Sequence, residues 1–422
     1  MFKKILSLCL AVMMVATLCA SFASCGNSKD DFKLGVILLH DEASTYDKNF
    51  IEAVERAKEQ LGLTDEQVIY KKGIPESNAC YEAAADLVDE GCDIIFADSF
   101  GHETYMLKAA KEFPNVQFCH ATGTMAHTEK LPNFHNAFAS IYQGRYLAGV
   151  AAGLKLNEMI ESGKITAEQA KMGYVGAFTY AEVISGYTSF YLGAKSVCPS
   201  VTMEVQFTGS WYDEIKEKEA ATALINNNCV LISQHADSMG APTACETAGI
   251  PNVAYNGTTG KTETFIIASR INWVPYFEYM LDCVITGKDI KTDYTGSIDT
   301  GSVVITELGT AAAAGTQAKL DEVKAALKNG TLKVFDCSKF TVKNAKADTS
   351  EFSKAASITM DENGKLTGYK ADVDDAGDYV PETEVIKTEN GVTYFAESEL
   401  RSAPYFDIII DGISIGASVA VQ

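Results

Sequence analysis

The chain has 422 residues and a formal net charge of −21 at pH 7. So acidic a chain repels nucleic acid, and the sequence contains no basic stretch interleaved with aromatic residues, which excludes nucleic-acid binding as a function class. The length predicts two domains rather than one, and a hydrophobic share of 47% is ordinary for a folded globular protein.

The amino terminus is typical of an exported protein. Lys3 and Lys4 precede an apolar run from Ile5 to Leu18, and the next charged residue is Lys29. A basic start followed by a short apolar segment predicts a secretory signal peptide. An uncleaved membrane anchor is the alternative, because the uncharged stretch is long enough to span a bilayer.

Small residues precede Cys25 in a pattern that resembles a bacterial lipobox, although Phe22 stands where this motif usually has Leu. In such a motif the cysteine becomes the lipidated first residue of the mature protein, and each buried methylene of the lipid contributes about 0.8 kcal/mol to membrane binding. We therefore predict a signal peptide at 1–24, lipidation of Cys25 and a flexible tether at 25–32. The expected location is the cell membrane, with the protein lipid-anchored on its extracytoplasmic face.

The first part of the mature chain alternates strands and helices. A nearly continuous apolar run at 32–39 predicts a parallel strand covered on both faces. Apolar residues at helical spacing follow at 50–61, and Thr45 or Asp47 is expected to cap this helix. The same rhythm continues with strands expected at 68–70, 92–97, 116–120 and 136–140 and helices at 79–90 and 103–113. This alternation predicts an α/β lobe at 33–140.

A helix from Ile141 to Lys155, rich in Gly and Ala, is expected to pack closely and to carry the chain into a second α/β lobe at 141–265. The remaining strands are expected at 172–178, 201–207, 230–233, 253–255, 264–270 and 302–306. The remaining helices are expected at 184–197, 214–226, 243–248, 273–285 and 318–328, and Trp273 is interpreted as a core residue.

The tail from 334 to 422 differs in composition, with many Lys, Asp, Glu and Thr residues and short alternating apolar pairs. Asn363-Gly364 and Asn390-Gly391 are strong signals for tight hairpin turns. We expect a C-terminal β-rich extension packed on the core, in which the segment 402–410 docks against a lobe.

Eight cysteines follow Cys25, and none of them forms a close pair or a CxxC motif. Several lie in or beside predicted strands. Buried, reduced cysteines that act as small hydrophobic residues are the favoured interpretation. Disulfides are the alternative, because an even count permits them.

Zinc-protease and dinucleotide-binding motifs are absent from the sequence, which has no HExxH or GxGxxG pattern. Four of the six histidines, His40, His102, His120 and His235, fall at predicted carboxyl ends of strands, but none has the spacing of a zinc site. We interpret them as the polar lining of a cleft, and we expect no catalytic residue, no metal and no cofactor.

Ligand binding is the favoured interpretation of these strand ends, because ligands of doubly wound α/β folds lie where the carboxyl ends of strands converge. Trp211 comes after a Gly-Ser break directly behind one predicted strand, and Asp237 follows the next strand. A flat aromatic face beside carboxylate acceptors suits a purine base or nucleoside better than a phosphate or an acidic solute. The sequence also offers few cations and no glycine-rich cradle at these positions.

Six longer motifs resemble one family: IIFADSFG at 94–101, FCHATG at 118–123, YQGRYLAG at 142–149, GYVGAF at 173–178, GSWYD at 209–213 and QHADS at 234–238. Together they are similar to the basic membrane protein (BMP) family of solute-binding lipoproteins of ABC transporters, over about residues 33–330. The resemblance implies a type I periplasmic-binding-protein fold: two Rossmann-like lobes with three interlobe crossovers, in which 273–287 returns to the first lobe and 300–330 to the second. It also implies a purine or nucleoside ligand between the lobes and delivery to an ABC permease.

The strand ends and the resemblance together indicate the ligand-binding residues Tyr46, Ser99, Phe100, Glu182, Trp211, Asp237 and Lys261. The loop at 40–47 and the segment 256–260 depart from the family pattern, which leaves the identity of the purine or nucleoside open. Two other functions remain open: a ligand-sensing surface lipoprotein that regulates a membrane partner, and a nucleoside hydrolase.

Overall fold

The structure is a computed structural model that describes residues 31–257, 262–342, 358–374 and 376–416, and every structural statement below refers to these residues. The predicted signal peptide, the lipidation site Cys25 and the predicted ligand contact Lys261 lie outside them. None of the described helices combines the length and the apolar character needed to cross a membrane.

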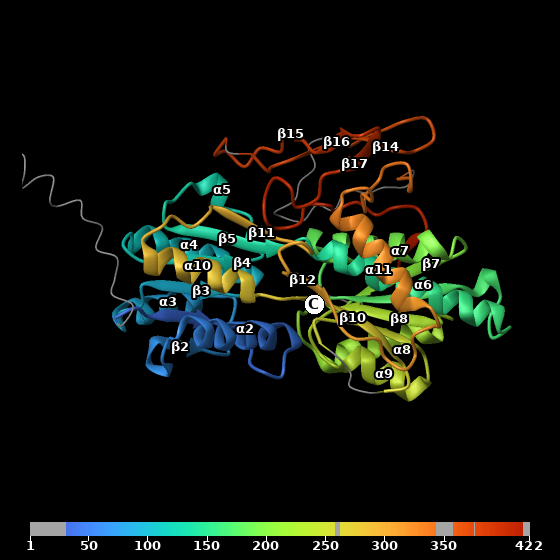
Figure 1. The fold of residues 1–422 in the computed structure, drawn as a ribbon, viewed down its shortest axis with the longest axis horizontal. Helices are drawn as coiled ribbons and strands as arrows, with labels where there is room; N and C mark the ends of the chain where they lie inside the picture. The colour runs from blue at the N-terminus through green and yellow to red at the C-terminus, as the bar shows by residue number, and fades with distance from the viewer. Residues whose placement is uncertain (1–30, 258–261, 343–357, 375, 417–422) are drawn as a thin grey trace, which may run out of the picture.

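Two large sheets, each covered by helices, form two lobes that lie side by side (Figure 1). The sheet of lobe 1 has the order β11-β5-β4-β3-β1-β2, and all its strands are parallel. Its strands are β1 (Leu34–Ile37), β2 (Val68–Lys71), β3 (Ile94–Ala97), β4 (Gln117–Ala121), β5 (Phe134–Ala139) and β11 (Asp293–Gly296). Its helices are α2 (Thr45–Leu61), α3 (Asn78–Asp89), α4 (Glu103–Glu112), α5 (Ala126–Glu129) and α10 (Val274–Thr286), with 3-10 turns at Asp65–Gln67 and Phe100–His102.

The sheet of lobe 2 has the order β12-β10-β9-β8-β6-β7-β18, and only the pair β10–β12 is antiparallel among its described strands. Its strands are β6 (Lys171–Gly176), β7 (Thr202–Phe207), β8 (Leu231–His235), β9 (Asn252–Tyr255), β10 (Phe265–Ile271), β12 (Val303–Ile305) and β18 (Ile413–Ile415). Its helices are α6 (Ile141–Glu161), α7 (Ala181–Val197), α8 (Glu214–Asn226), α9 (Gly240–Ala248) and α11 (Thr316–Lys328), with a 3-10 turn at Ala167–Gln169.

The chain crosses between the lobes three times: between β5 and α6, between β10 and α10, and between β11 and β12. The crossing segments are hydrogen-bonded to one another. The backbone N–H of Ser140 donates to the carbonyl of Gly296 at 2.8 Å, and the N–H of Asn272 donates to the carbonyl of Ser302 at 2.8 Å. These bonds hold the three segments together as the hinge between the lobes.

Close packing holds the first crossover helix in place, as its small residues predicted. A Cβ atom on Gly149 of α6 would lie 2.0 Å from the carbonyl oxygen of Phe190, and one on Gly193 of α7 would lie 2.1 Å from that of Tyr146. Any larger side chain at either position would force α6 and α7 apart. On the lobe 1 side of the hinge, Trp273 is buried and stacks on Phe50 with ring centroids 4.4 Å apart, so its interpretation as a core residue is confirmed.

The C-terminal extension forms a layer across both lobes (Figure 1). It contains β13 (Ile358–Met360), β14 (Leu366–Ala371), β15 (Thr383–Glu384), β16 (Ile386–Glu389) and β17 (Val392–Phe395). Both predicted hairpins are present, and Asn390 and Gly391 have φ values of 50° and 81°, the left-handed conformation that a tight hairpin turn needs. The segment 402–410 is largely buried, as the docking prediction requires.

The last strand of the extension, β18, adds to the edge of the lobe 2 sheet by pairing in parallel with β7. One local expectation needs correction. The cap of α2 is neither Thr45 nor Asp47 but Ser44, whose hydroxyl accepts the N–H of Asp47 at 3.1 Å. All eight described cysteines are buried, as the interpretation of small hydrophobic residues requires, and none of them is joined in a disulfide.

Candidate functional site

A cavity with about 350 Å³ of empty space lies between the lobes, at the carboxyl ends of strands from both sheets. Six of the seven predicted ligand-binding residues line this cavity. The seventh, Lys261, lies outside the described residues. The lining residues are Leu39, Tyr46, Asp47, Ser99, Phe100, Thr122, Glu182, Trp211, His235, Asp237 and Tyr255.

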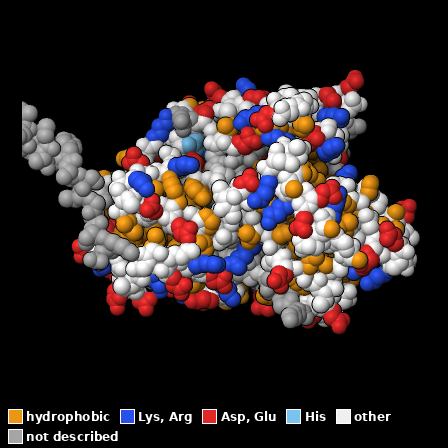
Figure 2. Space-filling model, viewed as in Figure 1, with side chains coloured by type: hydrophobic (Ala, Val, Ile, Leu, Met, Phe, Trp, Pro, Cys, Tyr) orange, Lys and Arg blue, Asp and Glu red, His pale blue; other side chains and the backbone are white. Residues whose placement is uncertain are grey.

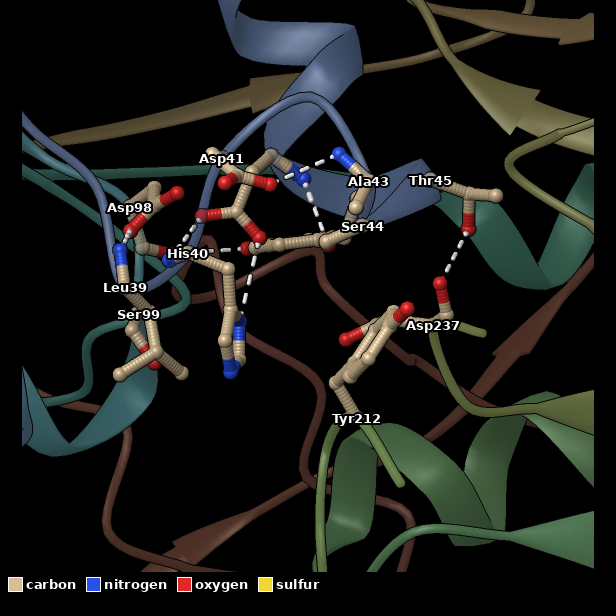
Figure 3. A network of polar contacts seen from close by, with 12 residues as sticks. Leu39, His40, Asp41, Ala43, Ser44, Thr45, Asp98, Ser99, Tyr212 and Asp237 are labelled. Atoms are coloured by element: carbon tan, nitrogen blue, oxygen red, sulfur yellow. Dashed lines mark hydrogen bonds and ion pairs between the residues drawn. The ribbon is translucent and has the colours of Figure 1, made fainter. Parts of the chain in front are cut away.

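The loop between β1 and α2 and the first turn of α2 form part of the wall from lobe 1 (Figure 3), and residues that follow β3 and β4 form the rest. The carboxylate of Asp47 accepts the backbone N–H of His40 at 2.7 Å, which folds the loop back on the first turn of α2. The phenol of Tyr46 donates to the backbone carbonyl of Asp98 at 2.9 Å, so this ring is fixed against the end of β3.

A pair of carboxyl groups lies under this loop. Asp98 is fully buried and accepts the N–H of Leu39 at 3.1 Å. Burial raises the pKa of Asp98 well above its usual value, and the neighbouring Asp47 raises it further. Burial alone would also raise the pKa of Asp47, but hydrogen bonds from His40 and Ser44 lower it overall. Within the pair, Asp98 therefore holds a proton more tightly than Asp47 does.

Aromatic rings form a continuous surface that begins in lobe 1 and continues in lobe 2. Phe100 of lobe 1 and Tyr180 of lobe 2 have ring centroids 4.8 Å apart. Tyr180 stacks on Phe178 at 5.1 Å, and Phe178 meets the edge of Trp211 at 5.0 Å. Offset and edge-to-face contacts of this kind stabilise the rings in fixed positions, and they leave the partly buried Trp211 on the cavity wall.

Glu182, His235 and Tyr255 line the part of the cavity that belongs to lobe 2. The Nε2 atom of His235 lies 3.4 Å from the carboxylate of Glu182, and its ring packs at a tilt against that of Tyr255, with centroids 4.1 Å apart. Burial lowers the pKa of His235, although the neighbouring Glu182 opposes this. A neutral imidazole therefore presents one donor and one acceptor nitrogen in this region.

Asp237 connects both walls of the cavity through its backbone (Figure 3). Its N–H donates to the carbonyl of Trp211 at 2.9 Å, and its carbonyl accepts the N–H of Thr45 at 3.0 Å and the hydroxyl of Thr45 at 3.1 Å. Its side chain, by contrast, makes no hydrogen bond within the described parts of the chain, although the residue is only 5% exposed. Burial raises the pKa of Asp237 well above its usual value, and the nearby Asp47, Glu217 and Glu182 add to the shift.

The cavity is lined by acidic side chains and not by described basic ones. Three carboxyl groups, those of Asp47, Glu182 and Asp237, line it, and none of the lining residues that the structure describes is a Lys or Arg. Such a wall disfavours phosphate and carboxylate ligands and favours ligands that donate hydrogen bonds or carry positive charge. Nowhere in the described residues do three His, Cys, Asp or Glu side chains come together in a group that could hold a metal ion.

The lobes are closed over the cavity. Besides the bonds between Thr45 and Asp237, the side-chain amide of Asn49 donates to the backbone carbonyl of Asn256 in lobe 2 at 3.3 Å. At the mouth, the ring of His40 lies 5.4 Å from that of Tyr212 (Figure 3). A small molecule in the cavity would therefore touch both lobes at once.

Three lining residues, Leu39, Asp47 and Tyr255, were not expected to contact a ligand. Leu39 comes two residues after β1, and Tyr255 is the last residue of β9, so the strand-end rule could have found both. Asp47 was interpreted only as a helix cap. The lining residues Thr122 and His235 lie at or next to the carboxyl ends of β4 and β8, where the same rule places ligand contacts.

The closed cleft between two α/β lobes with three crossovers defines a two-lobed binding protein. The family model described as "ABC transporter substrate-binding protein PnrA-like" (Bmp) matches residues 36–336, and the chain belongs to this family. The resemblance noted in the sequence motifs is thus confirmed.

Individual proteins agree with this assignment. A purine-binding protein of Brucella abortus is 29% identical over 86% of this chain and 99% of its own length. A protein of Haloferax volcanii, provisionally named as the glucose-binding protein of an ABC transporter, is 32% identical, but the match spans only 51% of this chain and 52% of that protein. The crystal structure of an ABC transporter solute-binding protein from Aeropyrum pernix K1 superposes with a TM-score of 0.62 at 15% identity, over 72% of this chain and 93% of the other, and confirms the type I periplasmic-binding-protein fold.

Proposed function

We propose that this protein is an extracytoplasmic lipoprotein that binds a purine nucleoside or purine base between its lobes and delivers it to the permease of an ABC importer. The observation that carries the proposal is the combination, in one closed cavity of a Bmp-family protein, of an aromatic surface with carboxyl groups and without a described cation. A purine offers a flat face to the rings and N–H donors to the carboxylates, and a ribose offers hydroxyl groups.

The same cavity argues against phosphorylated ligands. A 5′-phosphate would meet Asp47, Glu182 or Asp237 without a compensating described Lys or Arg. Burying such a charge without a partner is costly. The proposed ligand is therefore the nucleoside or base and not the nucleotide. Lys261 stays a predicted contact in this proposal.

Transport follows from closure of the lobes. A ligand that contacts both walls stabilises the closed form relative to the open form, and the permease distinguishes the two by shape. Phe100, Tyr46 and Ser99 act from lobe 1, and Trp211, Glu182 and Asp237 act from lobe 2. Lipidation of Cys25 keeps the protein at the membrane beside its permease. No chemical step is assigned to the cavity, so the protein is not an enzyme in this proposal.

A thermal-shift panel tests the ligand class. The chain from residue 26 onward is heated with purine bases, nucleosides, nucleoside monophosphates, glucose and amino acids, because a ligand raises the unfolding temperature with the logarithm of its saturation. We expect nucleosides or purine bases to stabilise the protein and their monophosphates to have much weaker effects. Stabilisation by glucose alone would instead favour the function for which the Haloferax relative is named.

A further inference from the structure

The C-terminal block, defined here as residues 334–342, 358–374 and 376–416, lies almost entirely beyond the match to the family model, which ends at residue 336. In Figure 1 its red strands form a layer over both lobes, with β15 extending towards α5 of lobe 1 and β16 and β17 nearer α11 of lobe 2. The block therefore has the position of a second connection between the lobes, in addition to the hinge.

Its attachment to lobe 2 is a strand ladder. β18 pairs with β7 over Ile413–Ile415, and the N–H of Met203 donates to the carbonyl of Gly412 at 3.0 Å. The hydroxyl of Ser414 donates to the carbonyl of Met203 at 3.3 Å. Next to the hinge, the ring of Phe335 lies 5.4 Å from that of Tyr142 on α6. Backbone pairing at β18 and ring packing beside the hinge thus join the block to lobe 2 at two places.

Its attachment to lobe 1 includes separate polar contacts. The phenol of Tyr379 donates to the carboxylate of Glu129 on α5 at 2.7 Å. The backbone N–H and the hydroxyl of Ser402 donate to the carboxylate of Asp293 on β11 at 2.8 and 2.7 Å.

A histidine lies between two aspartates beside these bonds. The ring of His127 on α5 has one nitrogen 3.8 Å from Asp372 of the block and the other 3.9 Å from Asp293. Contacts of this kind can form and break as units, unlike a strand ladder.

Opening the cleft rotates lobe 1 against lobe 2 about the three crossovers and thereby moves α5 and β11 relative to β7. Since the block moves with lobe 2, its bonds to lobe 1 belong to the closed form described above. We propose that the C-terminal block is an interlobe latch, in which Tyr379 and Ser402 stabilise the closed form and so increase ligand affinity without touching the ligand. The proposal deepens the proposed function and rests on it for the identity of the ligand.

The test compares two double variants of the chain from residue 26 onward. The latch variant, Tyr379→Phe with Ser402→Ala, removes two hydroxyl groups that reach lobe 1. The control variant, Tyr394→Phe with Ser414→Ala, makes the same chemical changes where the partners are Glu399 of the block itself and Met203 of lobe 2. Both variants keep the backbone and the cavity unchanged.

Two readouts are measured. Calorimetry gives the affinity for adenosine, inosine and guanosine. Spin labels on Glu42→Cys and Ile215→Cys, two exposed positions on opposite lobes near the cleft mouth, report the distance between the lobes in ligand-free protein. The eight described native cysteines are buried, so the labels attach to the introduced ones.

We expect the latch variant to bind nucleoside about three- to thirtyfold more weakly, because each lost hydrogen bond contributes modestly to the closed form. The short-distance population should fall in parallel, while the control variant stays within twofold of the unmodified protein in both readouts. Equal behaviour of the two variants overturns the latch. If no nucleoside binds even the unmodified protein, the proposed function fails, and the distance measurement alone then decides about the latch.

Discussion

Replacing Asp237 by Ala should produce two effects of opposite sign. The carboxyl group lies in the cavity wall with 5% of the residue exposed and has no hydrogen-bond partner among the described residues. A buried group in this state destabilises the ligand-free fold, and a ligand that donates a hydrogen bond to it removes that cost. The backbone bonds of Asp237 to Thr45 and Trp211 persist in the variant, so the walls keep their shape.

The magnitudes follow from the contacts. Because burial disfavours the ionised form of Asp237, a hydrogen bond to this carboxyl group contributes about 0.5–1.5 kcal/mol, so the variant should bind a purine nucleoside roughly 2- to 12-fold more weakly. The ligand-free variant should be more stable to urea than the unmodified protein by about 1–2 kcal/mol, because an unpaired buried polar group costs an amount of this order. Calorimetry and urea unfolding measure the two effects separately.

Glu217→Ala provides the matched comparison. Glu217 is also fully buried, but its carboxylate accepts the backbone N–H groups of Ser238 and Asp213. Its removal leaves these donors unsatisfied and should lower the stability of the ligand-free protein. If Asp237→Ala lowers stability as Glu217→Ala does, and affinity stays unchanged, then Asp237 is a structural residue and the site assignment is wrong.

Three further outcomes are expected. Trp211→Ala should weaken nucleoside binding about 5- to 150-fold in calorimetry, since stacking on an aromatic ring contributes roughly 1–3 kcal/mol per base. Trp211→Phe should retain most of the affinity. Equal losses in both variants would show that stacking does not contribute to binding. Burial raises the pKa of Glu397 in the folded protein to about 7. Glu397 therefore ionises at lower pH in the unfolded chain than in the folded protein, and the free energy of unfolding falls as the pH rises from about 4.5 to 7. Urea unfolding across this range should therefore show a smaller decline for Glu397→Gln than for the unmodified protein, by on the order of 3 kcal/mol, and identical pH profiles would contradict the raised pKa. Cys25→Ala should release the protein from the membrane fraction on an immunoblot of fractionated cells, and continued membrane association would refute lipidation at this residue.

Most of the fold could be predicted from local patterns, because buried parallel strands are continuous apolar runs and helices repeat every three to four residues. β11 and β18 escaped this reasoning. The sequence of β11 is Asp-Tyr-Thr-Gly, which is not an apolar run, and it becomes a strand by pairing with β5, more than 150 residues earlier in the chain. β18 has only three residues, two of which are exposed, so it has no strand pattern of its own and becomes a strand by pairing with β7.

The site was predictable to the extent that strand ends determine it. Trp211, Asp237, Ser99 and Phe100 come together because the carboxyl ends of parallel strands from both sheets face one cleft. Asp47 was misjudged because Ser44, Thr45 and Asp47 are all good helix caps and only the tertiary structure selects one. The bond from His40 to the carboxylate of Asp47 holds that side chain in the cavity wall instead.

The contacts between the C-terminal block and lobe 1 could not be predicted in this way. Tyr379 and Glu129 are separated by 250 residues, and neither belongs to a recognisable motif. Pairs of this kind depend on how the lobes and the block are placed relative to one another, which local sequence patterns do not encode.

In the proposed function, the cavity accepts a purine nucleoside and rejects its phosphorylated form. Calorimetric titration of the chain from residue 26 onward with guanosine, inosine or adenosine, and with the corresponding 5′-monophosphates, measures this selectivity. We expect at least one nucleoside to bind at least about 100-fold more tightly than its monophosphate, a difference of about 2.7 kcal/mol. Equal or tighter binding of the monophosphate, or no binding of any nucleoside, would contradict it.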